Sequence, residues 1–404
     1  MIGLKHIVRW MFIIFVVLWM FLSCTMVGAM EQQTTVTVTN EQAAGESRSQ
    51  VEEITLMQAL QDVVEQTGTQ ISSSTTTQGT YTKDVVYAAA SSIVKVQTKS
   101  YAWHGNVLTG TFSFSIDADR EEYFLKKYAD DANAVLQYKQ MRDEYQSLRQ
   151  DIAALKQKLK ETKDPEEANQ ISEQIKNKNQ RYLSAIWFEK ALTQRMEKDY
   201  ENALISCDTA IAIDPAFPNN YGLKADIYDD MGNEEEAIRF YQKVLDLDSG
   251  YAVSYHNIAV IYHKRGEDAK ALPYIDQAIQ LAPYTIESYV LRASIYGSME
   301  NLAKALENYN QALALDSRHY DALAGKAMVE NQIGRYQEAF QDASQAISIR
   351  PEKFDGYAFR AFAEVFLGGR RKALEDVEQA IRYCQEPKMK ESLLQLRSII
   401  NSLG

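Results

Sequence analysis

The chain has 404 residues, of which 46% are apolar, 24% charged and 10% aromatic, and its net charge is −12. This length favours two or three domains with packed cores, and the 24 tyrosines exclude low-complexity disorder for most of the chain. The acidic balance argues against a nucleic-acid-binding protein, whose affinity depends on Lys and Arg. Three cysteines, Cys24, Cys207 and Cys384, are too few for a disulfide framework.

Residues 1–30 have the pattern of an export segment. Lys5 and Arg9 are the only charged residues there, and an apolar run over residues 10–22 follows them. This pattern predicts that residues 31–404 lie outside the cytoplasm, in the cell envelope. A buried N-terminal helix is the alternative interpretation.

Three fates of this segment stay open. The run Phe21-Leu22-Ser23-Cys24 resembles a bacterial lipoprotein signal, which would make Cys24 the lipid-bearing residue. Val27-Gly28-Ala29 fits the small-x-small pattern of ordinary signal cleavage. Residues 10–30 would span about 31 Å as a helix, enough for an uncleaved membrane anchor.

Residues 34–118 predict a small α+β domain. Alternation of apolar and polar residues indicates strands, and apolar residues at helical spacing indicate helices. The predicted elements are a strand over 34–40, a helix over 47–67, a loop over 72–82, a short helix over 84–92, and two strands over 93–103 and 107–117 joined by a turn.

Part of this domain resembles a known family. The runs 59–69, 71–73 and 91–96 are similar to a bacterial envelope domain of the lipoprotein-20 type, which also forms the N-terminal part of the flagellar-assembly T protein. The resemblance implies an envelope domain without a known active site. A rival hypothesis is an enzyme with its site in 34–118, for which the polar aromatic candidates are Tyr81, Tyr101, Trp103 and His104.

Residues 119–183 predict a charged helical hairpin. A heptad seam runs along its first half, formed by Met141, Tyr145, Leu148, Ile152, Leu155 and Leu159. Asp164 and Pro165 are typical of the N-cap and first position of the next helix. The alternative is an intermolecular coiled coil, which would make the protein a structural oligomer.

Residues 184–387 repeat with a period of 34, which gives six repeats. Small residues recur at repeat positions 8, 20 and 27, where they would let helices approach closely. Position 15 is Gly in four repeats and position 32 is Pro in three. Seventeen of the eighteen small positions are Ala: 191, 225, 259, 293, 327 and 361; 203, 237, 271, 305, 339 and 373; and 210, 278, 312, 346 and 380, with Val244 as the exception.

This pattern resembles the tetratricopeptide-repeat family. The resemblance implies a right-handed α-solenoid with a concave groove that binds protein segments, and residues 388–404 would form its capping helix. The predicted fold class is therefore mainly α, with the solenoid preceded by the hairpin and the small α+β domain.

Two clusters in the repeats are candidate partner-binding residues. Asp226, Asp229 and Asp230 occupy positions 9, 12 and 13, which line the groove in this family, and they would either bind a basic peptide or form a solvated face. His256 and His263 occupy positions 5 and 12 of the next repeat, and we expect them to face the groove. With Asp226 and Asp229 they would form a metal site or, more simply, a hydrophilic wall.

Phe362 and Phe366 form an apolar stripe with Phe359 in the last repeat. This stripe would either pack beneath the capping helix or form an exposed ligand patch. Cys207 and Cys384 are expected to be inert buried thiols. The sequence has no phosphate-binding glycine loop, dinucleotide fingerprint, nucleophile elbow or C-x-x-C pair.

Together these features predict an exported, membrane-associated scaffold or adaptor that binds a protein partner, with no cofactor, no metal, no catalytic residue and no nucleic-acid ligand.

Overall fold

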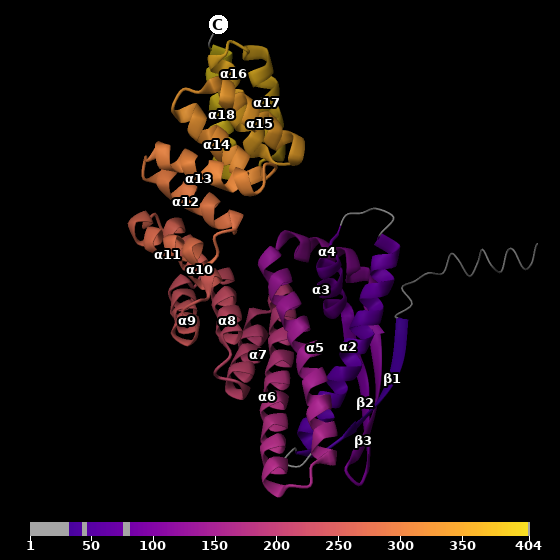
Figure 1. The fold of residues 1–404 in the computed structure, drawn as a ribbon. Coiled ribbons are helices and arrows are strands. Elements are labelled where there is room, and N and C mark those ends of the chain that lie inside the picture. Colours follow the sequence, from indigo (N-terminus) through magenta and orange to yellow (C-terminus); the bar gives the residue numbers. More distant parts are fainter. Residues whose placement is uncertain (1–31, 43–46, 76–80, 403–404) are drawn as a thin grey trace, which may run out of the picture. The chain divides into compact units, whose positions relative to one another are not determined.

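The computed structural model describes residues 32–42, 47–75 and 81–402. These residues form a chain of helices with one small antiparallel sheet, and they divide between Leu223 and Lys224 into two compact units (Figure 1). The predicted export segment and Cys24 lie outside the described residues.

None of the helices in the described ranges combines the length and the apolar character that crossing a bilayer requires.

The sheet of the first unit contains three strands, β1 (Gln32–Glu41), β2 (Val94–His104) and β3 (Val107–Ile116). Their order is β1-β3-β2, and β3 pairs antiparallel with both neighbours. Phe112 and Phe114 of β3 are fully buried, whereas Thr111 before them is exposed and Ser113 between them is half-buried. The alternation predicted from the sequence therefore gives the sheet one buried face and one open face.

Helix α2 (Arg48–Thr75) contacts all three strands, and α3 (Lys83–Ile93) packs against α2. Val51, Ile54 and Val63 of α2 are buried in this core. The predicted loop over 72–82 is wrong at its start, because α2 continues to Thr75. The buried Ile71 explains the longer helix, since it lies two helical turns beyond Val64 on the same face.

A 3₁₀ turn, η1 (Ala118–Arg120), leads from the sheet into α4 (Glu121–Asp130), α5 (Ala132–Glu161) and α6 (Pro165–Met196). The structure confirms the caps predicted for α6: Asp164 accepts a hydrogen bond from the backbone N–H of Glu166, and Pro165 is the first helical residue. Helices α5 and α6 pack antiparallel as a hairpin (Figure 1).

The hairpin packs on the small domain. Arg149 of α5 forms an ion pair with Asp62 of α2 at 3.1 Å, and the Tyr182 hydroxyl of α6 donates to the Gln61 side chain. Tyr145 is buried edge-to-face against Tyr182. The first half of the heptad seam is therefore buried within the chain itself.

Helix α6 runs without a break through residues 183 and 184, where the predicted boundary between hairpin and repeats falls. Its C-terminal half packs against α7 (Tyr200–Ile213), and together they form the first helix pair. Helix α8 (Pro218–Asp230) begins the second pair and contains the division between the two units.

The second unit is a stack of antiparallel helix pairs. Helix α9 (Glu234–Leu247) completes the second repeat. The later first helices are α10 (Ala252–Lys264), α12 (Ile286–Ser298), α14 (Tyr320–Gln332) and α16 (Phe354–Phe366). The later second helices are α11 (Asp268–Leu281), α13 (Leu302–Leu315), α15 (Tyr336–Ile349) and α17 (Arg370–Tyr383), and α18 (Pro387–Ser402) follows.

The recurring small residues lie where these helices touch. Every residue at repeat positions 8, 20 and 27 of the second unit is 1% exposed or less. At position 15 the chain turns between the two helices with a positive φ. Gly occupies this position in four repeats, but Lys198 (φ 63°) and Glu300 (φ 60°) occupy it in the first and fourth.

Helix α18 covers the end of the stack. Ile400 packs on Ala361, Ala373 and Val377, and Leu393 packs on Ala380. These contacts shield the apolar side of α17, which has no following repeat.

Candidate functional site: the first-helix face of the repeats

We call the side chains at repeat positions 5, 9, 12 and 13 of α8, α10, α12, α14 and α16 the first-helix face. All predicted partner-binding residues fall on it. The structure separates them into a charged group in the second and third repeats and an aromatic group in the sixth.

Asp226 is buried, with 4% of its surface exposed. Its carboxylate accepts hydrogen bonds from the Tyr241 hydroxyl and from the Asn257 amide, the latter at 3.4 Å. Burial, followed by the charge of Asp226, raises the pKa of Tyr241 well above its ordinary value, so this hydroxyl stays protonated and keeps donating. Asp226 therefore holds the second and third repeats together.

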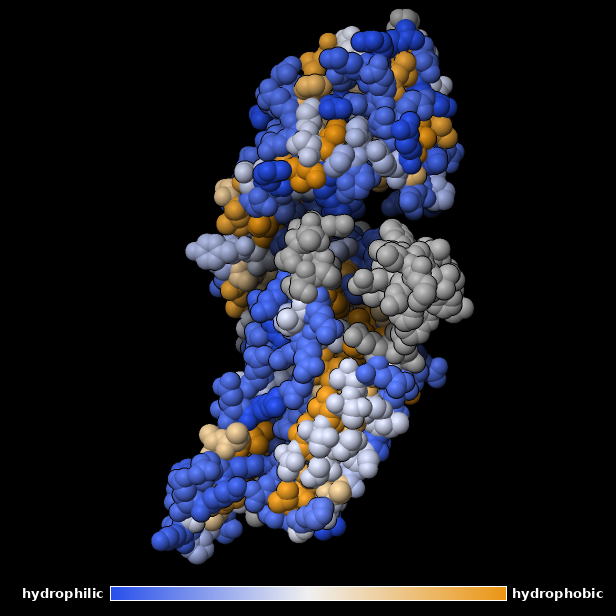
Figure 2. Space-filling model, turned by 90° about the vertical axis from the view of Figure 1, so that its right-hand side faces the viewer, coloured by the Kyte–Doolittle hydropathy of each residue, from blue (hydrophilic) through white to orange (hydrophobic). Residues whose placement is uncertain are grey.

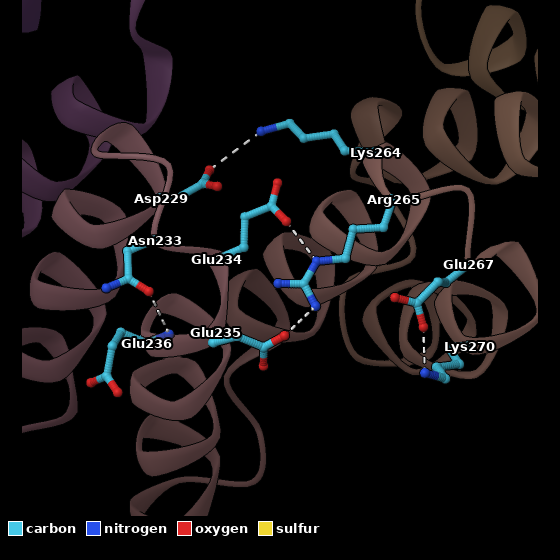
Figure 3. Close-up of polar contacts among 9 residues, drawn as sticks. All are labelled: Asp229, Asn233, Glu234, Glu235, Glu236, Lys264, Arg265, Glu267 and Lys270. Carbon is cyan, nitrogen blue, oxygen red and sulfur yellow. Dashed lines mark hydrogen bonds and ion pairs between the residues drawn. The ribbon is translucent and has the colours of Figure 1, made fainter.

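The carboxylates around Asp226 are paired with basic residues of the third repeat (Figure 3). Asp229 lies 3.4 Å from the Lys264 ammonium. Arg265 donates from Nε to Glu234 at 2.5 Å and from Nη1 to Glu235 at 2.7 Å. A basic ligand would have to compete with these internal partners, which weakens the interpretation of this region as a docking site for a basic peptide.

Two further acidic residues of the second repeat contact their own helix or lie at its end. The Glu236 backbone N–H donates to the Asn233 side chain, which caps α9, and the Glu236 carboxylate pairs with Arg239. Asp230 is exposed at the end of α8. Three successive acidic residues in the first turn of α9 also favour that helix electrostatically, independently of any ligand.

The two histidines bind hydroxyl groups of the following repeat. His256 Nδ1 lies 3.1 Å from the Ser288 hydroxyl, and burial lowers the pKa of this imidazole. His263 lies between Asp268, at 2.5 Å from Nδ1, and the Ser294 hydroxyl, at 2.9 Å from Nε2. Within the described ranges no three His, Cys, Asp or Glu side chains form a group able to hold a metal ion.

Phe362 and Phe366 are exposed to 38% and 55%, and their rings lie 5.1 Å apart. Phe366 also stacks on Tyr336, which begins α15. The hypothesis that α18 covers this stripe is wrong for these two residues, because α18 packs on a different side of α16, through Ala361 and Val365. Only Phe359 turns inward, where it packs against Ala324 and Ala327.

The aromatic patch therefore consists of Tyr336, Phe362 and Phe366, extended by the half-exposed Leu367. Tyr336 was missed in the sequence because it belongs to a second helix. The sequence feature that could have indicated it is its position directly after the turn at Gly334, which places it beside the first helix of the next repeat.

A second feature missed in the sequence is a series of polar pairs inside the repeats, between position 7 and position 23. Arg360 donates to both carboxylate oxygens of Asp376 at 2.7 Å. Lys326 pairs with Asp342 at 2.8 Å, and Arg292 donates to Asn308 at 2.7 Å. The signal was a basic residue recurring every 34 residues, followed 16 residues later by an acid or amide.

Glu330 lies beside one of these pairs, 3.5 Å from Lys326 and 3% exposed. Burial, together with the charge of Asp342, raises the pKa of its carboxyl group. These partly buried pairs connect the two helices of a repeat.

The four candidates of the enzyme hypothesis have different surroundings, and Tyr81 lies half-buried just before α3. The Trp103 indole donates to Glu52 at 2.8 Å and lies beneath the Arg48 guanidinium. Tyr101 packs edge-to-face on the core residue Phe112, and His104 is exposed at the end of β2. Cys207 and Cys384 are both buried thiols.

Comparison with known proteins identifies the repeats. Models of the tetratricopeptide repeat match residues 218–251, 250–318 and 290–353. Residues 218–353 therefore consist of tetratricopeptide repeats, which build the C-terminal solenoid. The comparison with curated proteins gives no match.

Similar solved structures include YrrB, described as a tetratricopeptide-repeat protein with an unusual peptide-binding site. It is 20% identical over 47% of this chain and 97% of its own, with a TM-score of 0.38. PilF of Pseudomonas aeruginosa is 16% identical over 55% and 99%, with a TM-score of 0.48. PilW, described as a type IV pilus biogenesis factor, is 18% identical over 52% and 98%, with a TM-score of 0.47.

Proposed function

We propose that the protein is a non-enzymatic adaptor of the cell envelope whose solenoid binds a protein segment, with the aromatic patch of the last two repeats as the anchoring site. Tetratricopeptide repeats are protein-interaction scaffolds, and this supports the general class. The observation that carries the proposal is the exposure of Phe362 and Phe366 on the first-helix face. Exposed aromatic groups of this kind are typical anchors of binding interfaces.

The charged end of the first-helix face is a secondary contact in this proposal. Asp229, Asp230, His256 and His263 line it, and Asp226 supports it from beneath. A basic segment would have to displace Lys264 and Arg265 from the carboxylates that they pair with. This end of the face would therefore contribute more to the choice of partner than to the strength of binding.

The proposed location rests on residues 1–30. The lysine and arginine before the apolar run, and the lipoprotein-like motif at Cys24, support export and membrane attachment. The small sheet domain would be the envelope domain of lipoprotein-20 type that its sequence resembles. Cell fractionation tests this part: Cys24→Ser is expected to release the protein from the membrane fraction if Cys24 carries the lipid.

Site-specific photo-crosslinking in cells tests the binding site. A crosslinking residue in place of Phe366 is expected to capture one dominant protein, and Phe362→Ala in the same chain should abolish the capture. Tyr284 is the matched control, because it is an exposed aromatic residue (83%) in the turn before α12 and outside the patch. Capture of the same proteins from both positions would overturn the assignment of the patch as the binding site.

A further inference from the structure

Strand β1 forms an edge of the sheet, because the strand order is β1-β3-β2. Among the described strands, only β3 pairs with it. It is ten residues long and keeps an unbroken register with β3 from Gln32 to Glu41. An edge strand of this length presents a row of backbone N–H and C=O groups that can pair with another strand.

The two edges of the sheet differ in their protection against such pairing. Strand β2 has an irregularity in register between Val96 and Thr98, and it carries Lys95 and Lys99. Bulges and lysines are devices that prevent edge-to-edge association. Strand β1 has neither, contains no proline, and has no charged residue before Glu41. The fold therefore blocks one edge and leaves β1 suited to pairing up to Asn40, whereas at Glu41 the Lys156 ammonium of α5 already donates to the backbone carbonyl at 2.8 Å.

The sequence of β1 is symmetric about its centre. Residues 35–39 read Thr-Val-Thr-Val-Thr, the same in both directions from Thr37. In an antiparallel pair of two β1 strands centred on Thr37, Thr35 lies opposite Thr39 of the second copy, and Val36 lies opposite Val38. Every residue of this segment thus meets its own kind, and such matched cross-strand pairs stabilise sheets.

In the same register, the residues on either side of this segment also meet without charge repulsion. Thr34 would lie opposite Asn40, and Gln33 opposite Glu41, so no two like charges meet. The threonines at 35, 37 and 39 are exposed, whereas Val36 and Val38 are partly covered. A two-fold axis perpendicular to the sheet would keep the valines of both copies on the helix-covered face and the threonines on the open face.

The open face of the sheet is uncharged around Thr37. Thr37 lies level with Thr111 of β3, and Thr111 lies level with Ser100 of β2. The hydroxyl groups of Thr37 and Thr111 are 3.4 Å apart. This surface has neutral, pale colouring in Figure 2. It places no charge beside the edge at which a second copy would pair.

We propose that two copies of the chain associate through β1, antiparallel and centred on Thr37, to form one continuous six-stranded sheet. The interface follows the two-fold rule for identical partners, in which the same surface contacts itself. It differs from the coiled-coil hypothesis for the hairpin, because Met141, Tyr145 and Leu148 of that seam are already buried within the chain.

Charge substitution at the centre of the proposed interface gives a direct test. The protein is expected to show a concentration-dependent mass approaching twice that of one chain in sedimentation equilibrium. Thr37→Lys and Thr37→Glu each place two like charges opposite each other, and each should raise the dissociation constant at least tenfold. An equimolar mixture of the two variants should dimerise again, because the opposed charges are then opposite in sign.

Ser100→Lys is the matched control, since Ser100 occupies the same level of the sheet at the other edge. It should leave the dissociation constant unchanged, and circular dichroism should show that all variants fold. A monomeric wild-type chain at every concentration would overturn the proposal. So would a dimer that is insensitive to Thr37→Lys, or lysine and glutamate variants that fail to dimerise when mixed.

Discussion

The ring of Phe366 lies flat on the ring of Tyr336, with 4.3 Å between their centroids and 4° between their planes. The two residues come from successive repeats, so the stack links the start of α15 to the end of α16. Stacked aromatic pairs contribute about 0.5–1.5 kcal/mol beyond their burial. Because the stack holds Phe366 in place while more than half of its surface stays open, a ligand would meet an anchor that is already ordered.

Truncation of the aromatic residues should separate binding from folding. Phe366→Ala is expected to lower the free energy of unfolding by less than about 1 kcal/mol, because most of its ring is already exposed. Phe359→Ala should lower it by about 3 kcal/mol, because its ring packs against buried alanines. Urea denaturation followed by circular dichroism measures both. Equal losses would mean that Phe366 belongs to the core.

Replacing a residue that has a left-handed backbone conformation by glycine should stabilise the solenoid. Glu300 turns the chain with a φ of 60°, a conformation that glycine adopts more easily. Glu300→Gly is therefore expected to raise the free energy of unfolding by about 0.5–1 kcal/mol. Glu307→Gly in the exposed interior of α13 is the control, and it should destabilise by about 1 kcal/mol. A thermal melt that shows loss for both variants would contradict this prediction.

Removing one partner of the ion pair between Arg360 and Asp376 should destabilise the protein more than replacing both partners. Asp376→Ala leaves a partly buried guanidinium without its carboxylate and is expected to cost about 2–3 kcal/mol of stability. Replacing both residues with leucine should cost less than this single change, since no charge remains to be desolvated. Chemical denaturation of the single and double variants checks this order. A double variant less stable than Asp376→Ala would contradict it.

Glu189 should make the stability of the first unit depend on pH. It lines a small cavity with Tyr138, Arg142 and Tyr145, and burial raises the pKa of its carboxyl group from 4.5 to about 7. Between these two values the unfolded chain releases a proton that the folded chain keeps. The contribution of Glu189 to stability is therefore fully present below pH 4.5 and is lost as the pH rises through 7, by up to about 3 kcal/mol.

Glu189→Gln is expected to flatten this dependence and to raise the melting temperature at pH 8. Glu173→Gln, at an exposed site on the same helix, is the matched control and should change neither. Thermal melts of the three proteins between pH 5 and pH 8 make the comparison. Parallel curves for the wild type and Glu189→Gln would show that Glu189 does not titrate as described.

The helix pairs could be predicted because the alanines recur where backbones must touch, which leaves room for no larger side chain. Where position 32 is proline, the tyrosine at position 4 of the following repeat also hydrogen-bonds to it. The Tyr289 hydroxyl donates to the Pro283 carbonyl at 3.0 Å, and Tyr357 donates to the Pro351 carbonyl at 3.1 Å.

Which individual side chains are available to bind a partner could not be predicted in the same way. Asp226 occupies a groove position, but Tyr241 reaches it from the second helix, and Lys264 neutralises Asp229 from the next repeat. These outcomes depend on long side chains crossing between helices, whereas the period of the sequence fixes only which helix carries each residue. The predicted domain boundaries remain predictions.

Helix α6 is a single helix of 32 residues. Its N-terminal half belongs to the hairpin, and its C-terminal half forms the first repeat with α7. Each residue inserted near its middle would rotate the repeat by about 100° relative to the hairpin and shift it by about 1.5 Å. Seven residues would nearly restore the original direction, whereas one or two would turn the α7-facing side of the rod away from its contacts. The length of this rod, counted in helical turns, thus sets the direction in which α7 packs relative to the hairpin.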